Sequence, residues 1–272
     1  WRRLLVVLRR VAPLDGRPSG QRSGDPRYDS ATGAGSVLTP LAGRARLVGV
    51  DSIRKALDEG VSLARVLVGE DDRSVDVSAL VVAAEAAGIP VSRESAREMR
   101  RMSESDEPEA ALAVAGPVLP STLDELMESP GLVLVLAGLR YPSNVGFILR
   151  AAEVSGAAGV VLETAWKAGE REEALRVSIR ADRFLAVLDA SAEQAATSAR
   201  DAGRRIIAVE TSGDALPWTT DFARPACLFL GSETEGLPVA VLETADVIVR
   251  VPTRGFIPSY NVQAATSMML GE

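Results

Sequence analysis

Histidine is absent from the 272-residue chain, and cysteine occurs once, as Cys227. The missing histidine excludes His-based acid–base catalysis, Ser–His and Cys–His nucleophile pairs, and His-ligated metal sites. A single cysteine excludes a disulfide framework and a Cys-rich zinc site, and it fits a reducing compartment, so we expect a cytoplasmic protein without a bound metal. Any catalysis must therefore use Arg, Asp, Glu, Ser, Thr, Asn or Tyr side chains, or a cofactor.

Long apolar runs are missing as well. No stretch approaches the roughly 18 uninterrupted apolar residues of a membrane span, so we expect no membrane partner. The run Leu4–Leu8 is shorter than the roughly 7–15 apolar residues of a secretory signal, which argues against one. Aromatic residues make up only 4% of the chain and apolar residues 47%, so we expect a sizeable core of aliphatic side chains.

Charge is distributed unevenly, although the net charge is −7. An acidic chain is by itself a poor candidate for nucleic-acid binding. Residues 1–46, however, hold nine Arg and three Asp, and all but two of the 30 basic residues of the chain are Arg. The planar guanidinium group suits recognition of phosphate. Net charge therefore does not decide whether the partner is a nucleic acid.

Composition divides the chain into four parts. Residues 1–44 are rich in Gly, Pro, Ser and Arg, which predicts a flexible basic arm. Residues 45–118 alternate apolar runs with helical patterns, which predicts a small α/β sandwich in which Asp51 or Ser52 caps the first helix. Residues 119–130 are expected to form a linker, and residues 131–272 the largest domain.

This last part contains six apolar runs of the kind that form buried parallel strands. They lie at 132–137, 159–162, 184–188, 205–209, 226–230 and 247–251. Helical patterns separate most of them, so we expect an α/β fold with a doubly wound parallel sheet. Ligands bind such sheets at the carboxyl ends of the strands.

Three polar motifs follow strands of this expected sheet. The first is Asn144-x-Gly146-x-x-x-Arg150, in which Gly146 permits close backbone approach and Ser143 or Asn144 is expected to cap the next helix. Taken alone, the motif also fits an ordinary capped helix with an Arg150–Glu153 ion pair.

The second motif, at 231–236, places a glycine at a strand end and Glu233 where a carboxylate could orient a substrate or an arginine. The third, at 251–262, is an irregular loop after which Ser259 and Asn261 head a final helix, Val262–Leu270. Taken alone, the second motif also fits an ordinary strand–turn–helix connection, and in the third motif Ser259 or Asn261 also fits a simple helix N-cap. No G-x-G-x-x-G follows a strand and no P-loop is present, which argues against a Rossmann dehydrogenase or a P-loop enzyme.

In their order and spacing, the three motifs resemble the SpoU/TrmH branch of the SPOUT RNA 2′-O-methyltransferases. Asn144, Gly146 and Arg150 match N-x-G-x-x-x-R, and residues 231–236 match G-x-E-x-x-G. The third pattern, I-P-M-x-G-x-x-x-S-L-N-V, is matched through Pro252, Gly255, Ser259, Asn261 and Val262, with departures at Val251, Thr253 and Tyr260. The resemblance covers about 131–272, and residues 45–118 look more loosely like the small L30e-like domain that often precedes it.

The resemblance implies a C-terminal trefoil knot that binds S-adenosylmethionine, a homodimer with the site near the subunit interface, and no metal. It implies that Arg150 activates the ribose hydroxyl. The positioning residues it implies are Asn144, Glu233, Ser259 and Asn261. The cofactor-binding residues it implies are Thr211, with Glu210 nearby, Leu230, Gly231, Val251, Tyr260 and Val262.

Structured RNA is the expected substrate, with ribosomal RNA favoured over tRNA. Two other interpretations stay open: a non-catalytic RNA-binding protein that kept the knot, and a small-molecule α/β enzyme. The final helix is expected to present an apolar face to a second subunit. Its residues at helical spacing are Val262, Ala264, Ala265, Met268 and Met269.

Overall fold

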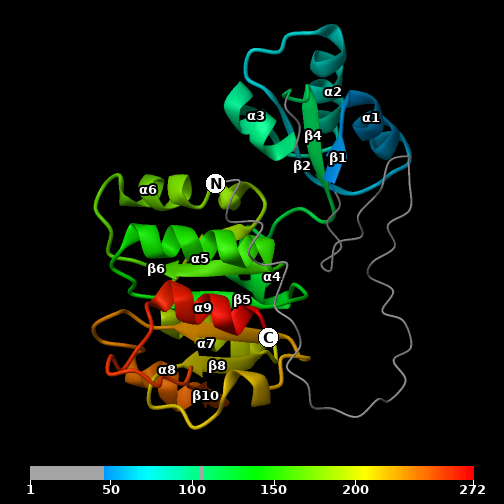
Figure 1. The fold of residues 1–272 in the computed structure, drawn as a ribbon. Coiled ribbons are helices and arrows are strands. Elements are labelled where there is room, and N and C mark those ends of the chain that lie inside the picture. The colour runs from blue at the N-terminus through cyan, green and yellow to red at the C-terminus, as the bar shows by residue number, and fades with distance from the viewer. Residues whose placement is uncertain (1–45, 104–106) are drawn as a thin grey trace, which may run out of the picture. The chain divides into compact units, whose positions relative to one another are not determined.

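The computed structural model describes residues 46–103 and 107–272, and these form two β-sheets with helices packed against them (Figure 1). The basic arm expected at 1–44 lies outside the described residues. Among the described helices, none combines the length and the apolar character that crossing a membrane requires.

The first sheet has four strands in the order β1-β4-β2-β3. Its strands are β1 (Arg46–Val48), β2 (Leu63–Gly69), β3 (Val91–Glu94) and β4 (Ala111–Ala115), and its helices are α1 (Val50–Asp58), α2 (Val75–Ala86) and α3 (Ala96–Ser103). Strand β4 runs antiparallel to β1 and β2, whereas β2 and β3 are parallel. The prediction that Asp51 or Ser52 caps the first helix is wrong, because α1 begins at Val50 with Gly49 as its N-cap.

The second sheet has six strands in the order β10-β8-β9-β5-β6-β7. They are β5 (Val133–Ala137), β6 (Gly159–Glu163), β7 (Ala186–Asp189), β8 (Arg205–Val209), β9 (Ala226–Leu230) and β10 (Val247–Val249). Every neighbouring pair is parallel, which confirms the expected α/β sheet.

Helices cover both faces of this second sheet, and β5 shows how the chain builds the two layers. Leu134 and Leu136 of β5 belong to one apolar core, and Val133 and Val135 to the other, because successive strand residues point to opposite faces. The helices of the first core are α5 (Pro142–Val154), α6 (Glu170–Val177) and α9 (Val262–Leu270). Those of the second are α4 (Leu123–Glu128), α7 (Ala192–Asp201) and α8 (Val239–Thr244).

Arg204 ties the segment after α4 to the sheet. It is 4% exposed, and its guanidinium donates to the carbonyl oxygens of Met127 at 2.9 Å, Ser129 at 2.8 Å and Ala226 at 3.1 Å, and also to that of Gly131. These four acceptors offset the cost of burying the charge, although the Nε of Arg204 has no hydrogen-bond partner among the described residues. These bonds therefore fix the chain between α4 and β5.

Gly146 brings α5 and α6 together. A Cβ on this residue would lie 2.6 Å from the Ala174 carbonyl oxygen and 2.6 Å from the Val177 Cβ. The close backbone approach predicted for this glycine is therefore observed, with α6 as the neighbouring element.

Gly146→Ala is expected to lower the free energy of unfolding by about 1–3 kcal/mol, because overpacking outweighs the higher helix propensity of alanine. Urea denaturation measures this. Gly255→Ala is the matched control, since a Cβ there meets no atom within 4 Å, and it should stay within about 0.5 kcal/mol of wild type. Equal stability of both variants would contradict the tight α5–α6 packing.

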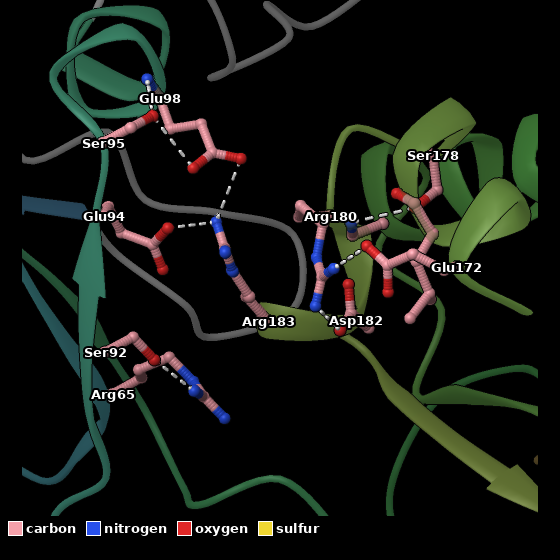
Figure 2. A network of polar contacts seen from close by, with 12 residues as sticks. Arg65, Ser92, Glu94, Ser95, Glu98, Glu172, Ser178, Arg180, Asp182 and Arg183 are labelled. Carbon is pink, nitrogen blue, oxygen red and sulfur yellow. Dashed lines mark hydrogen bonds and ion pairs between the residues drawn. The ribbon is translucent and has the colours of Figure 1, made fainter. Parts of the chain in front are cut away.

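The two sheets are linked by side chains around a short 3₁₀ helix, Ala181–Arg183. Figure 2 shows Arg183 reaching Glu94 at the end of β3 and Glu98 on α3, and its Nη1 lies 3.6 Å from Glu98 Oε1. Glu94 is 1% exposed, and burial raises the pKa of its carboxyl, an effect that Arg183 opposes. Phe184 packs against the cluster that contains Leu67.

Candidate functional site

A cavity of about 860 Å³ lies at the carboxyl ends of β8 and β9. Four segments line it: the start of α5, the residues that follow β8, the turn after β9, and the loop from β10 to α9. This is the edge at which open parallel sheets bind their ligands. The position agrees with the prediction made from the three motifs.

The chain after β8 runs beside the chain around β10. The Glu210 N–H donates to the Val249 carbonyl at 3.0 Å, and the Arg250 N–H donates to that of Ala215 at 2.9 Å. Gly213 makes this approach possible, because a Cβ there would lie 2.7 Å from the Ile248 carbonyl oxygen. Two segments that flank the cavity are thus held together by backbone hydrogen bonds.

The turn after β9 is tight and presents Glu233. A Cβ on Gly231 would lie 2.1 Å from the carbonyl carbon of Gly236, so only glycine fits there. Two backbone hydrogen bonds, at 3.2 and 3.0 Å, close the turn between Ser232 and Gly236. Glu233 Oε2 accepts the Arg140 N–H at 3.2 Å, which joins the turn to the loop before α5.

Asn144 connects the three predicted motifs. Its Nδ2 donates to Glu233 Oε1 at 2.8 Å, and its Oδ1 accepts a hydrogen bond from Asn261 Nδ2 at 3.3 Å. Asn261 is also the N-cap of α9, since its Oδ1 accepts the Gln263 N–H at 2.9 Å. Side chains that are 117 and 89 residues apart in sequence therefore form one network.

The start of α5 differs from the prediction. Ser143 and Asn144 do not cap the helix, because it begins at Pro142, with Tyr141 as the N-cap and no side-chain cap. Proline is well suited to the first helical position, since its missing N–H would have no intrahelical partner there. Asn144 lies in the first turn, where its amide is free to bind Glu233 and Asn261.

The predicted site residues separate into two groups. All six predicted cofactor-binding residues line the cavity, as do Asn144, Glu233, Ser259 and Asn261. Arg150 does not line the cavity; it is exposed on α5, six residues beyond Asn144, or about 9 Å along the helix axis. The roles assigned to these residues stay predictions.

Sequence reasoning missed some of the lining residues. They include Tyr141, Ala265 and Glu235. Glu235 lies inside the second motif, and this position in the motif could have identified it as a lining residue. Within the described part of the chain, the cavity walls carry three Glu side chains and no Lys or Arg.

Cys227 takes no part in this site. It is fully buried in β9, and burial raises the pKa of its thiol to about 11. A thiol in that state is a poor nucleophile at neutral pH. Cysteine-based covalent catalysis is therefore excluded at this position.

Comparison with known proteins gives the family. Residues 131–271 match the family described as SpoU rRNA Methylase. The chain belongs to the SpoU rRNA methylase family. The resemblance stated from the three motifs is confirmed.

Relatives of this SpoU chain include bacterial proteins named 23S rRNA (guanosine-2′-O-)-methyltransferase RlmB. The one from Ralstonia nicotianae is 30% identical over 197 residues, which covers 70% of this chain and 78% of the relative. The one from Pseudomonas putida is 28% identical over 191 residues, covering 68% and 77% of the two chains.

A solved structure, described as an S-adenosylmethionine-bound rRNA methyltransferase from Sinorhizobium meliloti, has the same fold. Its TM-score is 0.52 at 24% sequence identity, and the match covers 84% of this chain and 85% of the other. This SpoU chain therefore shares the α/β fold of that structure. The trefoil knot and the L30e-like character of residues 45–118 stay predictions.

Proposed function

We propose that this SpoU family protein is an S-adenosylmethionine-dependent RNA 2′-O-methyltransferase that acts on ribosomal RNA in the cytoplasm. The observation that carries the proposal is the Asn144–Glu233–Asn261 network, which joins three motifs at the wall of one cavity. The RlmB relatives, named for 23S rRNA, support ribosomal RNA over tRNA.

The cavity fits the methyl donor in size and chemistry. Sites for small ligands enclose about 300–1,000 Å³, and this one encloses about 860 Å³. Leu230, Val251 and Val262 offer apolar surface for a purine ring, and the strand ends offer backbone groups. Bound S-adenosylmethionine would supply a methyl group on a cationic sulfur, a donor already activated without a metal.

The network orients the groups around the ribose. Glu233 is anchored by the Arg140 N–H and holds the Asn144 amide, and Asn261 is fixed by its capping bond at α9. Side chains held in this way lose little entropy when a substrate binds, so they can position a ribose hydroxyl. Ser259 lies beside them in the cavity wall.

Arg150 is assigned the role of acting on the attacking 2′-oxygen of the ribose. A guanidinium group is unsuited to general-base catalysis, but it can bind the phosphate and stabilise negative charge that develops on the 2′-oxygen. Because Arg150 lies outside the cavity of its own chain, we place it at the ribose bound by a second copy. The site then needs a homodimer.

Exposed apolar side chains on α5 and α9, which pack against each other, and in the residues directly before these helices support this dimer. Tyr141 is 57% exposed, Phe147 48%, Tyr260 44% and Met268 42%. Large apolar side chains grouped on a surface mark interaction sites. The prediction that Met269 belongs to the apolar face presented to a second subunit is wrong, because Met269 is 2% exposed and packs in the core beneath α9.

Met268→Asp is expected to convert a dimer into a monomer, because it places a charge in the apolar contact between subunits. Sedimentation at micromolar concentration measures the change. Ser267→Asp, also exposed on α9, is the control for the added charge. A wild-type protein that is monomeric and fully active would refute the dimer. If Met268→Asp remains a dimer, the interface must lie on another surface.

S-adenosylmethionine should bind without RNA, because strand ends and loops of one chain line the cavity. Titration calorimetry tests this, with NAD and ATP as control ligands. Binding of NAD or ATP, and none of S-adenosylmethionine, would overturn the proposed function. Donor binding with RNA binding but no methyl transfer would favour the non-catalytic RNA-binding protein.

A further inference from the structure

The cavity has a negative character, and of its three carboxylates only that of Glu233 is required by a motif. Glu210, Glu233 and Glu235 line it, and among the described residues that line it there is no Lys or Arg. Carboxylates are normally ionised at neutral pH. A cationic ligand is therefore favoured over a neutral ligand of the same shape.

Glu210 differs from the other two carboxylates. It is half-buried at the end of β8, whereas Glu233 and Glu235 are exposed. Its Oε1 accepts the Leu237 N–H at 2.6 Å, which holds the carboxylate in the cavity wall. Gly236 makes room for it, because a Cβ there would lie 2.5 Å from the same oxygen.

The carboxylate of Glu210 keeps capacity beyond that bond. A carboxylate has about four acceptor positions, and the Leu237 N–H occupies one of them. Its charge is also less screened than that of an exposed carboxylate, because part of its surroundings is protein and not water. Of the three carboxylates, that of Glu210 is therefore the one least screened by water.

We propose that Glu210 is a specificity-determining residue that distinguishes the methyl donor from its product by charge. The inference rests on the proposed function. S-adenosylmethionine carries a positive sulfonium, and S-adenosylhomocysteine, which remains after the methyl group has gone to the ribose oxygen, has a neutral thioether. Attraction to Glu210 is thus present before transfer and reduced after it, which favours product release.

Titration calorimetry of Glu210→Gln with each ligand tests the proposal without measuring activity. Glutamine keeps the shape and an oxygen acceptor for Leu237, but it removes the charge. The expected result is a Kd for S-adenosylmethionine raised about fivefold, with less than a twofold change for S-adenosylhomocysteine. Glu243→Gln, an exposed residue of α8 outside the cavity, should change neither Kd.

A second variant separates charge from the Leu237 contact. Glu210→Asp keeps the charge and shortens the side chain, so it should retain the wild-type ratio of the two Kd values even where both values rise. Equal weakening of both ligands by Glu210→Gln, or no weakening of either, would overturn the proposal. Wild-type protein that binds neither ligand would instead refute the proposed function.

Discussion

Arg150→Ala is expected to lower the rate of methyl transfer by about 10²–10³-fold while leaving donor binding unchanged. Removing a hydrogen-bond donor that stabilises negative charge in the transition state typically lowers the rate by this factor. Arg150 is exposed and does not line the cavity, so neither the fold nor the binding of S-adenosylmethionine depends on it. Single-turnover methyl transfer and calorimetry measure the two effects separately.

The control for the lost charge is Arg176→Ala, which removes an exposed arginine from the neighbouring helix α6. Its transfer rate should stay within a few-fold of wild type. If Arg150→Ala also stays within a few-fold, Arg150 is an ordinary helix residue. The catalytic assignment would then have to move to another cation.

Glu233→Ala is the second substitution with a large expected effect, on the order of 10²-fold in kcat. It removes the acceptor of both the Asn144 amide and the Arg140 N–H, so the start of α5 loses its connection to the turn after β9. A displacement of about 1 Å in a positioning group can reduce a rate by that factor.

Glu235→Ala is the matched control, because this residue lies in the same turn and is also exposed at the cavity. It should leave kcat within a few-fold of wild type. A Glu233→Ala variant with unchanged kcat would show that the network of Asn144, Glu233 and Asn261 does not position the reacting groups.

The strands of the second sheet could be predicted closely from sequence. The runs at 205–209 and 226–230 coincide with β8 and β9, because strands buried on both faces are continuously apolar. Helix starts were less predictable. At α1 and α5, Gly49 and Tyr141 occupy the N-cap positions, although better capping side chains follow closely.

Contacts between segments that are distant in the chain could not be predicted from the sequence. The family resemblance implied that Asn144, Glu233 and Asn261 share a site, but their hydrogen bonds depend on how three loops meet. The bond from Leu237 to Glu210, across 27 residues, had no sequence signal. In α9, apolar residues lie on two faces, so periodicity could not separate exposed Met268 from buried Met269.

A map of 2′-O-methylated riboses in the total RNA of cells with and without this protein tests the proposed activity directly. Cells that lack it should lose methylation at a defined position of ribosomal RNA. Wild-type protein should restore that position, and the Arg150→Ala variant should not. An unchanged methylation map, or changes confined to tRNA, would contradict the proposal of a ribosomal RNA 2′-O-methyltransferase.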